Sequence, residues 1–291
     1  QSGQDVKILH VAVFRSRSTN VWQAAGFESL GHTVIRYDYR ALGRKYGRVR
    51  RDDHLIAVCR KERPDIILFS KCNLMDVRVV KECNKVGTTV LWYMDDPKPS
   101  CPNWDVELIN KMKHCSYVFC SVKKCVEDAK EYCENTYRLQ GGFDSAVHYP
   151  MSFPKKRNVT FIGTLRPEKR VFLEGWNFDT VIDVYGKDHS RIVSETRINL
   201  SFTHGGGTSN RLYKLLAAKG FVLTQPWEGM GEDFESGRDF VVFFTPQDLE
   251  RKIRYYLAHQ AERERIAAHG YETVKKYDNI NYAKKILEAI A

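Results

Sequence analysis

The chain has 291 residues, of which 43% are hydrophobic and 12% aromatic, and its formal net charge is +10. This length and composition are enough for one large or two medium domains with apolar cores. No apolar run approaches the roughly 20 residues of a membrane span, so we expect no integral membrane association.

The first half alternates apolar runs with amphipathic segments. Continuous apolar runs are typical of strands buried on both faces of a parallel sheet. The alternation therefore predicts a doubly wound α/β sheet. We expect strands at 8–14, 33–37, 65–70, 89–94 and 116–121, and helices near 19–30, 52–62, 74–86 and 122–132.

A stretch with two prolines and a basic cluster, residues 149–158, interrupts this alternation and reads as a linker. The alternation then restarts, with strands expected at 159–163, 181–185, 198–202, 221–225 and 240–244, and helices at 247–258 and 261–275. We expect a first domain over 4–149, a second over 150–275, and a C-terminal helix over 276–291 that packs back on the first domain. Neither half carries the glycine pattern of a dinucleotide site or of a Walker phosphate loop.

Most of the excess positive charge lies between residues 15 and 51, where nine Lys and Arg residues face only Glu28 and Asp38, a net +7. Such a concentration favours an anionic partner: a nucleic acid, an anionic polymer or a membrane surface. A solvated face that serves solubility is the alternative. The candidate contact residues are Arg15, Arg17, Trp22, Arg48, Arg50 and Arg51.

The eight cysteines all lie between Cys59 and Cys133. Their spacing has neither the paired pattern of a zinc site nor the density of a secreted disulfide scaffold. We therefore expect free thiols, no metal site and a cytoplasmic protein.

The stretch "SFTHGGGTSNRLYKLLAAKG", residues 201–220, combines an apolar run, three glycines and a helical pattern. We expect the helix to begin near Ser209 or Asn210 and to end at Gly220. A helix N-terminus behind a glycine-rich loop favours an anion, because free N–H groups and the helix dipole point at it. A surface loop without a ligand is the alternative.

Three stretches of the second half resemble the C-terminal domain of GT-B glycosyltransferases, in the branch of the CgeB spore-maturation proteins. They are "VTFIGTLRPEKRVFLE" (159–174), "SNRLYKLLAAKGFVLT" (209–224) and the segment from "MGEDFESGRDF" to "AAHG" (230–270). In the first half, "LWYMDDPK" (91–98) resembles the Asp-Asp-Pro of the same proteins. The resemblance covers residues 88–275 and implies a GT-B fold: two Rossmann-like domains that face a central cleft.

This resemblance implies transfer of a sugar from a nucleotide-sugar, expected to be a UDP-sugar, to an acceptor hydroxyl, with no cofactor and no metal. The second half would hold the donor, and protein cations and helix N-termini would neutralise the leaving diphosphate. The implied donor-binding residues are Gly163, Thr164, Arg166, Lys169, His204, Gly206, Thr208, Ser209, Asn210, Arg211, Lys214 and Glu232.

One position departs from the family pattern. Many GT-B enzymes carry a glutamate on the helix after the glycine loop that accepts hydrogen bonds from the ribose, and this chain has Lys214 there. A lysine cannot accept those bonds. Glu228 or Glu232 could then hold the ribose, or Lys214 could contact phosphate, or the chain could be inactive.

Asp95 and Asp96 are the candidate catalytic residues, because they follow a strand, where residues of the cleft belong. In an inverting transferase one of them would take the proton of the acceptor hydroxyl. A turn or helix-cap role is the alternative, and a retaining enzyme would need no such base.

Three functions compete at this stage. The first is a glycosyltransferase for an anionic polymer, in its sharpest form DNA with hydroxymethylated pyrimidines, since phage DNA glucosyltransferases also use GT-B folds. The second is a glycosyltransferase for cell-envelope or spore-surface glycans. The third is a catalytically silent nucleic-acid-binding protein on the same scaffold.

Overall fold

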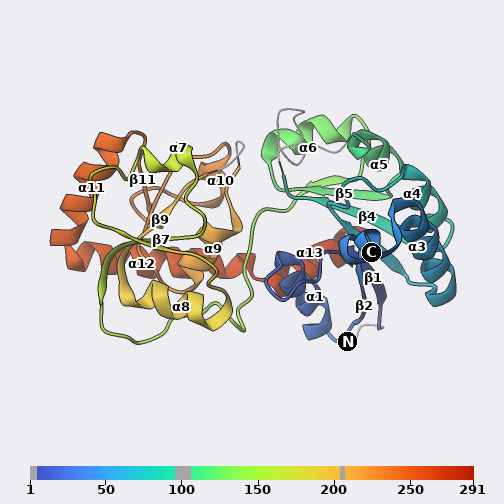
Figure 1. Cartoon of the computed structure of the whole chain (residues 1–291), viewed down its shortest axis with the longest axis horizontal. Coiled ribbons are helices and arrows are strands. Elements are labelled where there is room, and N and C mark those ends of the chain that lie inside the picture. Colours follow the sequence, from blue (N-terminus) through green and yellow to red (C-terminus); the bar gives the residue numbers. More distant parts are fainter. Residues whose placement is uncertain (1–4, 96–105, 204–206) are drawn as a thin grey trace. The chain divides into compact units, whose positions relative to one another are not determined.

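The computed structural model describes residues 5–95, 106–203 and 207–291. The chain divides into two compact units: unit 1 takes the chain up to residue 140 together with residues 279–291, and unit 2 takes residues 141–278. The boundaries expected from the sequence fall after residues 149 and 275. Each unit contains one parallel sheet with helices on both faces (Figure 1).

The sheet of unit 1 has six parallel strands in the order β2-β1-β3-β4-β5-β6. Strand β3 is buried along its whole length, as the continuous apolar run predicts. Chain order reverses direction between β1 and β3, which makes their carboxyl ends the switch point of the sheet. The strands are β1 (Lys7–Ala12), β2 (Thr33–Asp38), β3 (Ile66–Ser70), β4 (Thr88–Tyr93), β5 (Tyr117–Cys120) and β6 (Thr136–Arg138).

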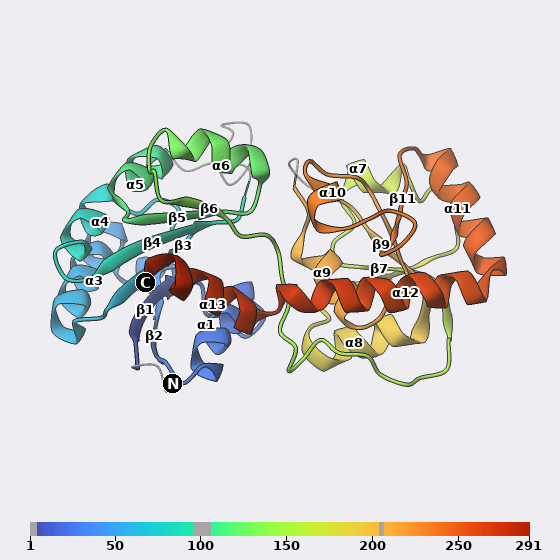
Figure 2. The same cartoon turned by 180° about the vertical axis from the view of Figure 1, so that it is seen from behind.

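Helices cover both faces of this sheet. Helices α1 and α13 lie on one face, while α3, α4 and α5 lie side by side on the other (Figures 1 and 2). Gly47, with φ +80°, separates α2 from α3. The helices of unit 1 are α1 (Thr19–Ser29), α2 (Tyr39–Tyr46), α3 (Arg48–Glu62), α4 (Val77–Cys83), α5 (Leu108–His114), α6 (Lys123–Lys130) and α13 (Asn279–Ile290).

The C-terminal helix α13 packs tightly against α1. A Cβ atom on Gly26 would lie 2.3 Å from the carbonyl oxygen of Asn279, so only glycine permits this approach. The Asn279 side chain donates to the Trp22 carbonyl oxygen at 3.0 Å. These contacts, which lie inside unit 1, explain why the last residues of the chain belong to it.

The sheet of unit 2 has five parallel strands in the order β11-β10-β9-β7-β8, with its switch point between β7 and β9. Helices α8, α9 and α12 lie on one face and α11 lies on the other (Figures 1 and 2). The strands are β7 (Arg157–Ile162), β8 (Asp179–Val181), β9 (Thr196–Ser201), β10 (Val222–Thr224) and β11 (Val241–Val242). The helices are α7 (Pro167–Arg170), α8 (Gly186–Glu195), α9 (Asn210–Ala217), α10 (Met230–Asp233), α11 (Pro246–Ala258), α12 (Gln260–Val274) and a 3-10 turn, Lys275–Tyr277.

The expected α/β class with two Rossmann-like sheets is confirmed. The sequence patterns missed β6, which is only three residues long, and the split of residues 39–62 into two helices. The end of α9 also differs: Lys219, with φ +56°, takes the left-handed position that we expected for Gly220. In the described part of the chain, no helix is long and apolar enough to span a membrane.

Candidate functional site

The carboxyl ends of β7 and β9 form the switch point of unit 2, and most of the expected donor-binding residues follow these two strands. Gly163 comes directly after β7, and helix α9 begins at Asn210, after the loop that follows β9. Ligands in doubly wound sheets bind at this edge.

Gly163 makes room for Arg211. Gly163 has φ +131°, and a Cβ atom there would lie 2.6 Å from Nη2 of Arg211. The guanidinium of Arg211 in turn lies over the ring of Phe161, 4.7 Å from its centroid. A glycine at the strand end and an aromatic ring beneath it therefore fix the position of this cation.

Lys169, from α7, joins the same cluster. Its ammonium nitrogen lies 5.5 Å from the centroid of Phe161 and 6.0 Å from that of Phe202. The ring of Phe161 therefore contacts two cations, Lys169 and Arg211, and keeps these two like charges close together. We call Lys169, Arg211 and Lys214 the cation cluster.

The charges of the cation cluster are only partly hydrated and are not balanced by carboxylates. Burial lowers the pKa of Arg211 to about 10, and burial followed by the charge of Arg211 lowers the pKa of Lys214 to about 8. The pKa of Lys169 is lowered by burial and then by Arg211 and Arg166, with only Glu168 acting in the opposite direction. Within the described ranges, none of the three has a carboxylate within ion-pair distance. Cations that repel one another in this way are stabilised by a polyvalent anion.

The N-terminus of α9 adds backbone donors to the cluster. Ser209 is the N-cap, its hydroxyl makes no cap hydrogen bond, and its Oγ atom is buried without a partner in the described part of the chain. The Asn210 side-chain oxygen accepts from the backbone nitrogen of Gly142 at 3.0 Å. Asn210 thus anchors the chain entering unit 2, and the N-terminus of the helix is a favourable position for an anion.

Two histidines beside the cluster were not anticipated. The rings of His148 and His189 meet edge to face with centroids 5.6 Å apart, and both side chains are buried. Burial and then Lys214 lower the pKa of His148 to about 3, and burial, His148 and Lys214 lower that of His189 well below its usual range. Both rings are therefore neutral at physiological pH. The two residues are 41 positions apart in the sequence, so no local pattern could have revealed the pair.

The remaining candidates of unit 2 are spread around this edge. Thr164 and Arg166 are exposed between β7 and α7, and Thr208 is half-buried before α9. Glu228 is exposed, and Glu232 is exposed on α10, where it borders a hollow of about 410 Å³ together with Asp233 and Lys276. His204 and Gly206 lie outside the described residues.

In unit 1, Asp95 follows β4 and is held by a lysine. The Lys71 ammonium donates to both carboxylate oxygens of Asp95 at 2.8 Å, and both side chains are half-buried. Asp96 lies outside the described residues. Lys71 follows β3, so the pair joins the ends of two neighbouring strands at the carboxyl edge of the sheet.

The loop that carries Lys71 has an unusual backbone. Lys71, Cys72 and Leu74 all have positive φ, at +61°, +51° and +60°. Such conformations cost free energy in non-glycine residues and persist only where the surroundings hold them.

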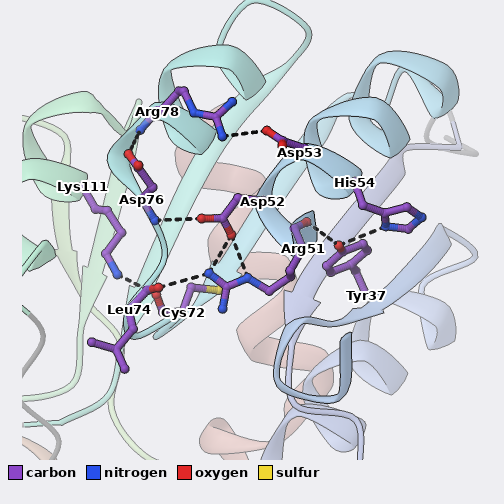
Figure 3. A network of polar contacts seen from close by, with 10 residues as sticks. All are labelled: Tyr37, Arg51, Asp52, Asp53, His54, Cys72, Leu74, Asp76, Arg78 and Lys111. Carbon is purple, nitrogen blue, oxygen red and sulfur yellow. Dashed lines mark hydrogen bonds and ion pairs between the residues drawn. The ribbon is translucent and has the colours of Figure 1, made fainter. Parts of the chain in front are cut away.

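A buried polar network supplies that hold, as Figure 3 shows. The Lys111 ammonium, fully buried, donates to the Cys72 carbonyl oxygen at 2.7 Å, and Arg51 donates to that of Leu74 at 3.1 Å. Arg51 is itself paired with Asp52 at 2.6 Å. The network therefore fixes the loop from which Lys71 reaches Asp95.

A second buried chain of hydrogen bonds reaches the residue before Asp95. His10 bonds to Ser70 at 2.8 Å, and the Ser70 hydroxyl donates to the Gln23 side-chain oxygen at 3.2 Å. The Gln23 amide nitrogen donates to the Met94 sulfur at 3.2 Å. Burial, followed by the charge of Arg36, lowers the pKa of His10 to about 3, so its ring is neutral. These contacts link β1, β3 and α1 behind Asp95.

The expected acceptor residues divide into two groups. Arg15, Arg17, Arg48 and Arg50 are exposed. Arg51 is 3% exposed and serves the network of Figure 3, and Trp22 is 5% exposed against Trp92 and Tyr282. Arg51 and Trp22 thus belong to the interior of unit 1, and their placement leaves them no part in a phosphate-binding surface. In the sequence, Arg51 stands next to other arginines and looks like part of the same charged surface. Its ion pair with Asp52 appears only in the structure.

Comparison with known proteins agrees with the geometry. Residues 149–288 match the family model described as glycosyl transferase-like. The structure of HepE from Anabaena in complex with UDP and glucose has a TM-score of 0.68 and 12% identity, over 98% of this chain and 99% of that one. The chain has the GT-B fold, and residues 149–288 are similar to the glycosyl transferase-like family. The expected GT-B fold is thus confirmed.

Two further structures show the same fold. Sucrose-phosphate synthase from Thermosynechococcus elongatus has a TM-score of 0.71 and 10% identity, over 98% of each chain. A glycosyltransferase from Rickettsia africae has a TM-score of 0.68 and 12% identity, also over 98% of each chain. No curated protein sequence matches the chain. In the described ranges, no group of three or more His, Cys, Asp or Glu residues could hold a metal ion.

Proposed function

We propose that the chain is a glycosyltransferase that uses a UDP-sugar, whose diphosphate binds the cation cluster of unit 2. The observation that carries the proposal is the set of three partly buried cations, Lys169, Arg211 and Lys214, with no carboxylate in ion-pair range among the described residues. A diphosphate would restore the lost solvation and remove the mutual repulsion. The HepE structures, which hold UDP or UDP-glucose on the same fold, support the choice of nucleotide.

In this proposal Lys214 contacts phosphate and does not hold the ribose. The cation that replaces the expected glutamate lies beside Arg211, whose charge helps to lower its pKa. In the transfer, the acceptor oxygen attacks the anomeric carbon, the bond from that carbon to the diphosphate breaks, and the cluster stabilises the departing anion. In an inverting reaction Asp95 or Asp96 accepts the hydroxyl proton.

We further propose a polyanionic acceptor bound by unit 1, with DNA carrying hydroxymethylated pyrimidines as the first acceptor to test. The support is a group of exposed cations that follow β1 and β2: Arg15, Arg17, Arg44, Lys45, Arg48 and Arg50. Duplex DNA is held mainly through its phosphates, for which such cations are suited. A spore-surface or envelope glycan, as for the CgeB-like enzymes, is the alternative acceptor. The seven described cysteines carry free thiols, which supports a reducing, cytoplasmic location.

A thermal-shift panel of nucleoside diphosphates and their glucose conjugates tests the donor assignment. A ligand at 100 times its dissociation constant adds about 2.7 kcal/mol of stability. We expect UDP and UDP-glucose to stabilise the protein and ADP and GDP to do so less. Absence of stabilisation by every nucleotide would contradict the proposal, and binding without sugar hydrolysis or transfer would identify a silent scaffold.

A further inference from the structure

Unit 2 contains a second cationic cavity, distinct from the cation cluster, at the opposite edge of its sheet. The cavity has a volume of about 580 Å³, within the range of small-molecule sites. Its walls come from segments that precede strands: Lys155 stands before β7, Arg197 lies at the start of β9, and Phe221 stands before β10. It therefore lies at the amino ends of the strands, whereas the cation cluster follows their carboxyl ends.

Four cations and one carboxylate line this cavity. The cations are Lys155, Arg197, Lys219 and Arg263, and the carboxylate is Glu264. Glu264 accepts a hydrogen bond from the Gln260 amide at 2.8 Å. In the described part of the chain, none of the four cations forms an ion pair, so the cavity carries a net positive charge that the protein leaves unbalanced.

The cations are held in place by neutral partners. Arg263 is 7% exposed, and its guanidinium donates to the carbonyl oxygens of Tyr256 and Leu257. The Lys155 ammonium donates to the Thr196 carbonyl oxygen at 2.9 Å, and Arg197 donates to the Asn158 side chain at 2.9 Å. Carbonyl partners orient a cation without neutralising it, which leaves its charge for a ligand.

The backbone at Lys219 adds to this pattern. Lys219 follows α9 with φ +56°, a conformation that glycine adopts readily and lysine does not. Gly220 stands at the next position, where a Cβ atom would lie 2.6 Å from Val193. The left-handed position is therefore occupied by Lys219, and this lysine forms part of the wall of the cavity.

The rest of the wall is apolar. Met151, Phe153, Phe221 and Ala267 contribute carbon surface, and Phe153 is 40% exposed. A cavity with cationic side chains on one part of its wall and apolar side chains on another suits a ligand that has both an anionic group and an apolar group.

We infer that this cavity binds a small organic phosphate, a phosphate group joined to an apolar or aromatic body. The phosphate contacts Lys155, Arg197 and Lys219, and the body packs against Phe153 and Phe221. This inference does not depend on the donor assignment, because its residues and its strand edge are different.

Phenyl phosphate is the probe, with phenol and inorganic phosphate as its two halves, and calorimetry on the full chain is the measurement. Lys155→Gln and Arg197→Gln should each weaken phenyl phosphate binding by about tenfold or more, since each removes a charged hydrogen-bond donor. Lys156→Gln is the matched control: Lys156 is the next residue, is paired with Glu195, and does not line the cavity. Phenol and inorganic phosphate should each bind more weakly than phenyl phosphate.

A parallel titration with UDP separates this site from the donor site. Lys155→Gln and Arg197→Gln should keep the parent affinity for UDP, and Lys169→Gln should keep the parent affinity for phenyl phosphate. Loss of phenyl phosphate binding in Lys169→Gln, or its retention in both Lys155→Gln and Arg197→Gln, would overturn the inference. Equal affinity for inorganic phosphate and phenyl phosphate would contradict the organic part of it.

Discussion

The guanidinium of Arg211 occupies the space that a side chain at Gly163 would fill, with Nη2 only 2.6 Å from the position of a Cβ atom. Gly163→Ala should therefore displace Arg211 from the cation cluster. The variant should also lose about 1–3 kcal/mol of stability, because alanine at φ +131° is strained. We expect UDP affinity to fall about tenfold or more. Calorimetry and urea denaturation would measure the two effects.

Gly231→Ala is the matched control, since a Cβ atom at Gly231 of α10 would meet nothing within 4 Å. It should bind UDP as the parent does. If Gly163→Ala also binds UDP with the affinity of the parent, the contact between Gly163 and Arg211 does not contribute to donor binding.

The pH dependence of UDP binding should report on Lys214. Its pKa is lowered to about 8, so between pH 7 and 9 the free protein loses most of this charge, and affinity should fall as pH rises. Lys214→Gln should bind more weakly at pH 7 and show a flatter profile. Arg211, with a pKa of about 10, and His148, with one of about 3, titrate outside this window.

The same shift has a consequence for folding. The folded protein releases the Lys214 proton near pH 8, whereas the unfolded chain releases it near the ordinary lysine value of 10.5. The unfolded state thus binds more protons between these values, and the contribution of Lys214 to stability rises with pH across the window. Denaturation of parent and Lys214→Gln at pH 7.5 and 9.5 would measure it. The free energy of unfolding of the parent minus that of Lys214→Gln should rise between these two pH values, and a value that falls or stays constant would contradict the assignment.

The Asp95 carboxylate should be needed for transfer and not for donor binding. Asp95→Asn keeps the size of the side chain and removes both the base and the charge that faces Lys71. If the enzyme is inverting with Asp95 as base, turnover should fall about 100-fold or more while UDP affinity stays unchanged. Single-turnover transfer and UDP calorimetry give the two readouts. Near-normal turnover in both Asp95→Asn and Asp96→Asn would place the base elsewhere or indicate a retaining reaction.

The exposed arginines at the start of α3 should govern binding to a polyanion. Replacing Arg48 and Arg50 by Ala removes two charges and spares the buried Arg51. On duplex DNA each lost phosphate contact should flatten the log–log salt dependence by about 0.9. The control replaces Arg238 and Arg251, two exposed arginines of unit 2. DNA binding that both double variants weaken equally would reflect net charge alone, and no DNA binding by the parent would favour a glycan acceptor.

Local patterns were sufficient for most of the fold and for part of the candidate site. Apolar runs marked the long strands, and the resemblance to GT-B enzymes pointed to the Gly-Thr and Ser-Asn-Arg motifs, which lie next to the strands and helix that build the switch point of unit 2. The pair of Lys71 and Asp95 was out of reach, since the two residues are 24 positions apart and meet only when β3 and β4 lie side by side. Burial of Arg51 and Trp22 was equally hidden, because charge and aromaticity in a sequence do not say which face of a helix points inward.

The most direct test of the account is the affinity for UDP of two neighbouring variants of α7, Lys169→Ala and Arg170→Ala. Lys169 is partly buried over Phe161 beside Arg211, whereas Arg170 is exposed on the same short helix. Each variant removes one positive charge, so a difference between them reports position and not net charge. The account predicts that Lys169→Ala weakens UDP binding by about tenfold or more and that Arg170→Ala binds within about twofold of the parent. UDP affinity that is unchanged in Lys169→Ala would contradict the donor site proposed for this protein.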